Sequence, residues 1–174
     1  MSGRRRMVRT RPRNGLAIGD VLTAAIVSEL CWPSEELWLV TGWVTDIPVI
    51  DNAERQFDSV MGGEPRSQMT LSEVLGTLTK RGTQLHVALR EEDHNQTFID
   101  RLRRTSATDS LHVYSSADLH EKMMVGWSWV LKGSMNFTWN GVQRNEESLE
   151  FEVDQAEAAR QRLELRTRWI GGSA

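Results

Sequence analysis

Two short polar clusters in the second half of the chain contain the residue types that phosphate chemistry uses. His120 and Lys122 are separated by one residue, and Ser134 and Asn136 follow with the same spacing. A lysine binds a phosphate as a point charge, and serine and asparagine donate hydrogen bonds to its oxygens. A histidine can attack phosphorus or move a proton. These four side chains therefore suit phosphoryl transfer without a metal ion.

The spacing of two residues predicts how these side chains are positioned. Alternate residues of a strand share one face of a sheet, so we expect His120 and Lys122 to lie together in a strand over residues 119–125. A tight turn near Gly126 connects it to a second strand over residues 128–133, which is a hairpin signature. The second polar set on this hairpin is Lys132, Ser134 and Asn136.

The motifs together resemble the signature of the phospholipase D superfamily, which reads H-x-K-x(4)-D, then G-[GS]-x-N, then N-x-E. They occur in the family's order and span roughly residues 111–153. The chain is most similar to the short bacterial nucleases that carry one such motif per chain. The matching residues are His120-Glu121-Lys122, Gly133-Ser134-Met135-Asn136-Phe137-Thr138 and Asn145-Glu146-Glu147.

One position departs from the family pattern. Trp127 stands where the superfamily has its aspartate. That aspartate is regarded as supporting the structure of the site and is not the nucleophile, and the tyrosyl-DNA phosphodiesterase branch works without it. The resemblance implies that Glu147 orients the catalytic imidazole. The implied catalytic set is His120, Lys122, Ser134, Asn136 and Glu147.

The resemblance implies a metal-independent phosphodiesterase, most similar to an endonuclease that cleaves DNA through a phosphohistidine intermediate. This chemistry needs two histidines, one as the nucleophile and one as the acid for the leaving oxygen. The chain has a single H-x-K motif, so the resemblance implies a homodimer with a shared active site that takes His120 from each subunit. No cofactor and no metal ion is expected, and the expected partner is DNA rather than RNA. Some members of this kind belong to bacterial DNA-restriction or phage-defence systems.

Two other functions stay open. The motif recognises phosphate and does not specify its substituents, so a lipid phosphodiesterase of the phospholipase D type is the enzymatic alternative. The second is a catalytically silent subunit that binds nucleic acid or acts as a scaffold, which Trp127 and the N-terminal arginines suggest. Tryptophans beside the motif, namely Trp127, Trp129 and Trp139, more often serve core packing, but exposed ones would stack on unpaired bases.

The remaining sequence predicts the elements that carry the motif. Helical and strand patterns alternate, which predicts one α/β domain over residues 16–174 with a mixed β-sheet flanked by helices. Residues 46–66 are expected to be irregular around a short helix. A capping box of Thr70 and Glu73 opens a helix that ends before Gly82. The other predicted strands are residues 37–45, 84–89, 111–115 and 147–153, and the other predicted helices are residues 21–30, 97–104 and 156–169, with a short helical piece after residue 138.

Charge and composition limit the partners. The net charge of −3 excludes a basic field over the whole surface, but six arginines precede the first acidic residue. Residues 1–15 are therefore predicted to be a disordered basic arm, either a simple tail or a contact for backbone phosphates. No apolar run approaches the roughly 18 residues that cross a bilayer. The short apolar runs predict no membrane partner. The only cysteine, Cys31, cannot form an internal disulfide, so a cytoplasmic protein is expected.

Several residues that resemble functional groups have structural interpretations. His86, His94 and His112 are predicted to be hydrogen-bonded structural histidines. Trp38 and Trp43 are predicted core residues, because their strand is continuously apolar. The acidic run of residues 91–93 is predicted to be a solvated turn, because consecutive acidic side chains point apart and do not converge on a metal.

Overall fold

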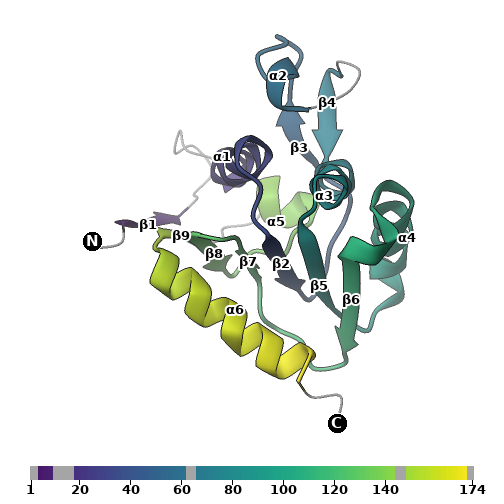
Figure 1. The fold of residues 1–174 in the computed structure, drawn as a ribbon, viewed down its shortest axis with the longest axis vertical. Coiled ribbons are helices and arrows are strands. Elements are labelled where there is room, and N and C mark those ends of the chain that lie inside the picture. Colours follow the sequence, from purple (N-terminus) through teal and green to yellow (C-terminus); the bar gives the residue numbers. More distant parts are fainter. Residues whose placement is uncertain (1–3, 10–17, 62–65, 144–147, 172–174) are drawn as a thin grey trace.

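The computed structural model describes residues 4–9, 18–61, 66–143 and 148–171. A seven-stranded mixed sheet forms the centre of the molecule (Figure 1). β2, β5 and β6 are parallel neighbours, and every other pair in this sheet is antiparallel. The predicted mixed α/β domain is confirmed. The order is β1 (Arg4–Arg9), β9 (Ser148–Val153), β8 (Trp129–Gly133), β7 (Met123–Val125), β2 (Glu36–Thr41), β5 (Gln84–Arg90) and β6 (Leu111–Ser116).

Helices cover both faces of this sheet. One face carries the larger apolar cluster, to which α1 (Ile18–Cys31), α3 (Leu71–Lys80) and α4 (Asp93–Thr105) contribute. The other face is covered by α6 (Gln155–Trp169) (Figure 1). Along β2, Leu37 and Leu39 enter the larger cluster, whereas Trp38 and Val40 enter the α6 cluster. Burial on both faces explains the continuous apolar run of this strand. Smaller elements are α2 (Asp58–Met61), α5 (Trp139–Gln143) and the 3-10 helix Thr108–Ser110.

The predicted helix boundaries follow from capping side chains. The Glu73 carboxylate accepts a hydrogen bond from Thr70 N at 2.9 Å, which closes the capping box of α3. Gly82 follows that helix with φ of +100°, a conformation that glycine adopts without strain. Asp154 Oδ1 accepts bonds from the backbone nitrogens of Ala156 and Glu157, at 2.8 and 3.0 Å, and so begins α6.

Residues 4–9 differ from the predicted disordered arm. They form β1, which pairs antiparallel with β9 from Arg4↔Val153 to Arg9↔Ser148. The Arg5 guanidinium lies 2.6 Å from a carboxylate oxygen of Glu150 on β9. Without β1, β9 would be an edge strand with unpaired backbone groups and acidic side chains, which an arginine-rich strand satisfies. Residues 1–3 and 10–15 of the predicted arm lie outside the described residues.

Two other segments are more regular than their sequences suggest. The expected irregular stretch over residues 46–66 contains its expected short helix as α2, but it also contains β3 (Pro48–Asp51), which pairs with β4 (Gln68–Thr70) in a small separate sheet. α4 begins at Asp93, earlier than the predicted residue 97. Its first turn is polar, so apolar periodicity does not reveal it. Among the described helices, none is long and apolar enough to cross a membrane.

Candidate active site

The end of β2 and the start of β7 meet at one edge of the sheet. The two strands are antiparallel, with Val40 paired to Met123, so the residues before β7 lie beside the residues after β2. β8 returns along β7, and Gly133 N donates to the Lys122 carbonyl oxygen at 3.2 Å. This edge therefore collects residues 41–45, 119–122 and 133–138.

His120 and Lys122 lie just before β7, so the prediction that a strand contains them is wrong. Their segment is held by side-chain contacts in place of a strand ladder. Leu119 is buried in the α6 cluster, and Glu121 forms an ion pair of 3.1 Å with Arg168 of α6. His120 is exposed between these two anchors. Lys122 Nζ donates to the His120 carbonyl oxygen at 2.7 Å, so a direct hydrogen bond links the two motif residues.

Asn136 connects this segment to the end of β2. Its Oδ1 accepts hydrogen bonds from Thr41 Oγ1 and Trp43 N, both at 3.3 Å. A Cβ atom at Gly42 would lie 3.6 Å from the same Oδ1 and 3.4 Å from the carbonyl oxygen of Leu119. Gly42 is therefore in contact range of both the Asn136 side chain and the residue before His120, which brings the two halves of the motif together.

Ser134 is fixed against the start of β9. Its backbone N donates to Ser148 O at 3.1 Å, and Ser148 N donates to Ser134 Oγ at 3.1 Å. A Cβ atom at Gly133 would lie only 2.0 Å from Ser148 O. No side chain fits there, which explains the glycine before Ser134 in physical terms.

Lys132, which the sequence groups with the motif, does not join it in the structure. Lys132 turns toward α6, where its Nζ lies 3.8 Å from a Glu150 oxygen and 4.0 Å from a Glu157 oxygen. Glu147 lies outside the described residues. The structure therefore places at one end of the sheet the segments that carry four residues of the predicted catalytic set, namely His120, Lys122, Ser134 and Asn136.

Asn95, which the sequence analysis did not identify, stabilises the same edge. This buried side chain of α4 accepts a bond from Val44 N at 2.9 Å and donates to the carbonyl oxygens of Gly42 and Arg90, each at 2.9 Å. It thereby ties the loop after β2 to the end of β5. No short motif marks such a residue, because two of its three partners, Val44 and Gly42, lie about 50 positions away in the chain.

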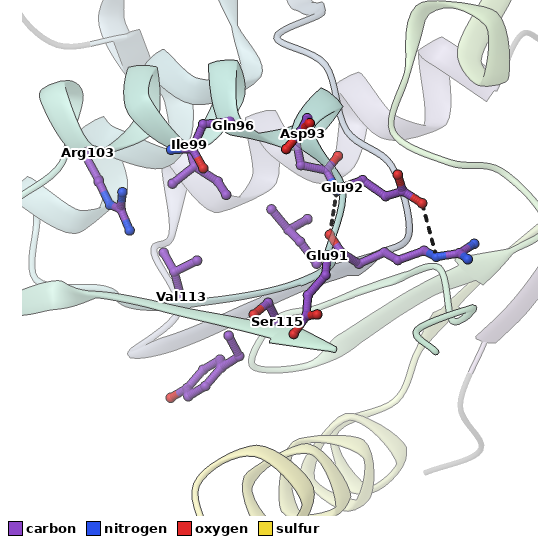
Figure 2. Close-up of a pocket in the computed structure, with 12 residues that line it drawn as sticks. Glu91, Glu92, Asp93, Gln96, Ile99, Arg103, Val113 and Ser115 are labelled. Atoms are coloured by element: carbon purple, nitrogen blue, oxygen red, sulfur yellow. Dashed lines mark hydrogen bonds and ion pairs between the residues drawn. The ribbon is translucent and has the colours of Figure 1, made fainter. Parts of the chain in front are cut away.

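A cavity of about 480 Å³ opens at the C-terminal ends of β5 and β6 (Figure 2). Figure 2 shows Glu91, Glu92 and Asp93 near the start of α4, and Arg90 Nε lies 3.4 Å from Glu92 Oε1. In the part of the chain that the structure describes, no three His, Cys, Asp or Glu side chains form a group that could hold a metal ion. The four motif residues do not line this cavity, so it is separate from the motif.

The tryptophans divide between core and surface. Trp38 is fully buried as predicted, and Trp129 is buried with its Nε1 donating to Glu29 at 2.6 Å. The prediction of a core position is wrong for Trp43, which is 46% exposed because it lies beyond the end of β2. Trp139 is also exposed, in the segment that follows Asn136.

Trp127 occupies the turn at the other end of β7, three strand residues away from the His120 segment. Its backbone N donates to Ser34 Oγ at 2.7 Å. Arg162 of α6 donates to the carbonyl oxygens of Gly126 and Trp127, and its guanidinium lies 4.8 Å from the centre of a Trp127 ring. The position that carries the family aspartate is therefore part of a turn held by other groups.

His86 lies on the α6 face of β5, away from the motif. Its ring stacks between Trp38 and His112, with centroid distances of 4.3 and 4.7 Å, and its Nδ1 lies 3.0 Å from the Tyr114 hydroxyl. Burial, together with the neighbouring His112, lowers the pKa of His86 to about 4. His112 Nε2 in turn lies 3.0 Å from Gln84 Oε1. Both residues have the structural surroundings that their sequence interpretation predicts.

Comparison with protein families decides the classification. A family model described as "Cardiolipin synthase, PLD-like domain" matches residues 47–169, which is well over half of the chain. The chain belongs to the PLD-like family. The matched region includes the segments before β7 and after β8, so it contains His120, Lys122, Ser134 and Asn136.

Solved structures share the PLD-like fold. Nuc from Salmonella typhimurium, a phospholipase D family member, is similar at a TM-score of 0.62 with 12% identity, over 98% of this chain and 95% of that chain. NucT from Helicobacter pylori gives 0.64 with 13% identity, over 95% of each chain. TrmBL2, an archaeal chromatin protein with a novel mode of DNA binding, gives 0.58 with 12% identity, over 95% of this chain and 51% of that one. At these identities the likeness concerns the fold. No curated protein sequence matches the chain.

Proposed function

We propose that this PLD-like protein is a metal-independent phosphodiesterase, specifically an endonuclease that cleaves DNA. The observation that supports the proposal is that the segments carrying His120, Lys122, Ser134 and Asn136 lie at the same end of the sheet. A nucleophile, a cation and two hydrogen-bond donors are the groups that a phosphodiester requires when no metal ion assists.

The four side chains divide into phosphate binding and chemistry. Lys122 supplies the positive charge for the phosphoryl oxygens, and the Ser134 hydroxyl supplies a hydrogen bond. The Oδ1 of Asn136 accepts from Thr41 and Trp43, whereas its Nδ2 makes no hydrogen bond among the described residues. That amide nitrogen is thus oriented by its own oxygen and remains available to a phosphate oxygen.

His120 carries the covalent step in this proposal. An imidazole nitrogen attacks phosphorus, the bond from phosphorus to the leaving oxygen breaks, and His120 of the partner subunit protonates that oxygen. The partner subunit's His120 then takes a proton from water, the water oxygen bonds to phosphorus, and the phosphorus–nitrogen bond breaks. Each chain has one such histidine, so the proposal requires a homodimer with a shared active site.

A DNA substrate is favoured by the protein's fold relatives and by its exposed aromatic residues. TrmBL2 shows that a chain sharing this fold belongs to a DNA-binding protein. Trp43 and Trp139 are exposed beside the motif, where their aromatic faces can stack on bases.

The proposal includes a cytoplasmic location, supported by the single free cysteine, Cys31. It also includes a role in DNA restriction or phage defence, which the family resemblance suggests.

Cleavage in the presence of a chelator tests the proposal directly. Purified protein is incubated with plasmid and single-stranded DNA, with and without excess EDTA, and we expect equal cleavage in both conditions. Activity that appears only with added Mg²⁺ or Mn²⁺ would contradict the proposal. Wild-type protein without any cleavage would support the silent subunit, and hydrolysis of phosphatidylcholine vesicles without DNA cleavage would support the lipid phosphodiesterase.

Sedimentation tests the shared site separately. The active species should have about twice the chain mass of 19.8 kDa. A strictly monomeric protein that still cleaves DNA would contradict the two-histidine mechanism.

A further inference from the structure

A second hollow, of about 470 Å³, lies directly beside the motif and is called here the tryptophan groove. One part of its wall follows the end of β2, another comes from the start of α4, and the third follows Asn136 in the chain. The residues that define it are Trp43, Thr45, Glu92, His94, Thr138, Trp139 and Asn140.

Hydrogen bonds fix the tryptophan groove relative to the motif. Trp43 N donates to Asn136 Oδ1 at 3.3 Å, and Thr45 N donates to Phe137 O at 2.9 Å. Val44 and Phe137 form an isolated parallel bridge between these two walls. The same two segments therefore form both the proposed phosphate site and the groove. A ligand that occupies both sites would have its position in one fixed relative to its position in the other.

Two large aromatic side chains border the tryptophan groove without being buried. Trp43 is 46% and Trp139 is 53% exposed, whereas Trp38 and Trp129 are buried in the core. Neither exposed ring stacks on another aromatic ring or lies under a cation within the described ranges. Exposed indole faces beside a polar site are available to a flat ligand.

The tryptophan groove lacks the cations that favour a phosphate, so it suits an uncharged ring better. Among its described lining residues are the carboxylate of Glu92 and the imidazole of His94, with no lysine or arginine. The charge of Glu92 is partly balanced by Arg90 at 3.4 Å, and the N–H groups of a nucleobase can donate to its carboxylate. Lys122, which suits a phosphate, lies in the neighbouring motif.

We propose that the tryptophan groove binds an unpaired nucleobase next to the phosphodiester held by His120, Lys122, Ser134 and Asn136. Trp43 and Trp139 stack on the base, and Glu92 accepts from its polar edge. A paired base cannot leave its partner to enter the groove without loss of stacking and pairing, so the groove makes the protein selective for single-stranded or distorted DNA. This inference rests on the proposed function of the motif.

An abasic substrate isolates the contribution of the base. Cleavage of a single-stranded oligonucleotide is compared with cleavage of a strand of the same length that has abasic sugars throughout, and the ratio of the two rates is the readout. We expect wild type to favour the strand with bases by roughly 5-fold to 100-fold, the range that stacking supplies. Trp43→Ala and Trp139→Ala should each bring the ratio close to one, and Trp43→Phe and Trp139→Phe should restore part of it.

Trp32→Ala is the matched control, because Trp32 is 83% exposed but follows α1, before β2, whereas Trp43 follows the end of β2. It should leave the ratio unchanged. A ratio near one in wild type, or a ratio unaffected by both alanine variants, would overturn the tryptophan groove as a base site.

Binding separates failure of the groove from failure of the proposed function. Fluorescence anisotropy of a labelled octathymidylate is measured in EDTA at fixed salt for wild type and the same variants. If wild type cleaves nothing but the alanine variants bind the octathymidylate 5-fold or more weakly, the phosphodiesterase proposal fails and the base site stands. Binding of phosphocholine in place of the octathymidylate, lost in the same variants, would overturn the base site in favour of a cationic headgroup.

Discussion

The two ends of the β7–β8 hairpin differ in how they are built. Before β7, the His120 segment is exposed, and its neighbours Asn136 and Gly42 bring polar groups to it from β8 and β2. After β7, hydrogen bonds from α6 and to Ser34 after α1 hold the backbone of the turn with Trp127, whose ring is 43% exposed; this is called here the packed end. At the first end the side chain of His120 is exposed, whereas at the other end the backbone groups of the turn are used in internal hydrogen bonds.

This difference separates two roles that a single sequence motif combines. The H-x-K part lies at the exposed end, whereas the motif's aspartate position lies at the packed end. At the packed end, Arg162 satisfies the carbonyl oxygens of the turn and Ser34 accepts from its backbone N–H. The support expected from a carboxylate is thus supplied by other side chains, so replacement of the aspartate by Trp127 is compatible with an intact exposed end.

The largest effect should come from the exposed end. His120→Ala removes the proposed nucleophile and acid, so cleavage of single-stranded DNA should fall roughly 10⁴-fold or more. Because His120 is exposed, thermal unfolding and sedimentation should match wild type. His112→Ala is the control, because His112 lies on β6 and should retain cleavage. Full cleavage by His120→Ala would refute the mechanism.

Lys122→Ala should produce the next largest effect. Loss of its positive charge leaves charge on the phosphoryl oxygens unbalanced in the transition state, so the rate should fall by about 10³-fold. Lys132→Ala offers a matched control, since Lys132 is also a lysine of this hairpin but points toward Glu150 and Glu157. Comparable losses in the two variants would mean that the hairpin acts through its overall charge rather than through the motif.

The packed end should respond in stability instead of catalysis. Arg162→Ala leaves two carbonyl oxygens of the turn without their donor and removes the contact with the Trp127 ring. We expect the free energy of unfolding in urea to fall by about 3 kcal/mol. Cleavage per folded molecule should stay near the wild-type value. A selective loss of activity with unchanged stability would show that the two ends are coupled.

A pH titration measures the contribution to stability of His86 on the α6 face, in contrast to the catalytic role proposed for His120 at the exposed end. The pKa of His86 is about 4 in the folded protein, below its ordinary value near 6.5, so the unfolded chain binds the proton more readily. This contribution to stability is complete above pH 6.5 and is lost as the pH falls toward 4. Between pH 7 and pH 5 it should cost about 2 kcal/mol.

His86→Phe tests that assignment. A phenyl ring can still stack on Trp38 but does not titrate, so the unfolding free energy of this variant should depend less on pH between 7 and 5. An unchanged pH profile would mean that another group controls acid unfolding.

Local patterns in the sequence predicted much of this molecule, and long-range contacts account for what they missed. Apolar periodicity and caps such as Thr70 and Asp154 predicted the main helices and the sheet, because these signals lie within a few residues of one another. β1 was missed since its partner, β9, lies about 140 residues away. Short elements whose order depends on tertiary contacts carry little local signal.

The same distinction applies to the candidate site. The spacing of the motif predicted that His120 lies in a strand, but that strand begins only at Met123. Asn95 and the exposed position of Trp43 depend on how the ends of β2 and β5 meet, which no local pattern encodes.

The smallest effect is expected where the family pattern is restored. Trp127→Asp exchanges the ring that faces Arg162 for a carboxylate that can pair with the same guanidinium, so one favourable contact replaces another. The unfolding free energy should change by less than about 1 kcal/mol. Cleavage should equal that of wild type or rise, because the turn is separated from His120 by the whole of β7. Urea unfolding and cleavage of the same single-stranded DNA measure both quantities. If Trp127→Asp folded normally but lost cleavage more than about 10-fold, the packed end would have to act on the chemistry, and the separation of the two ends would be wrong.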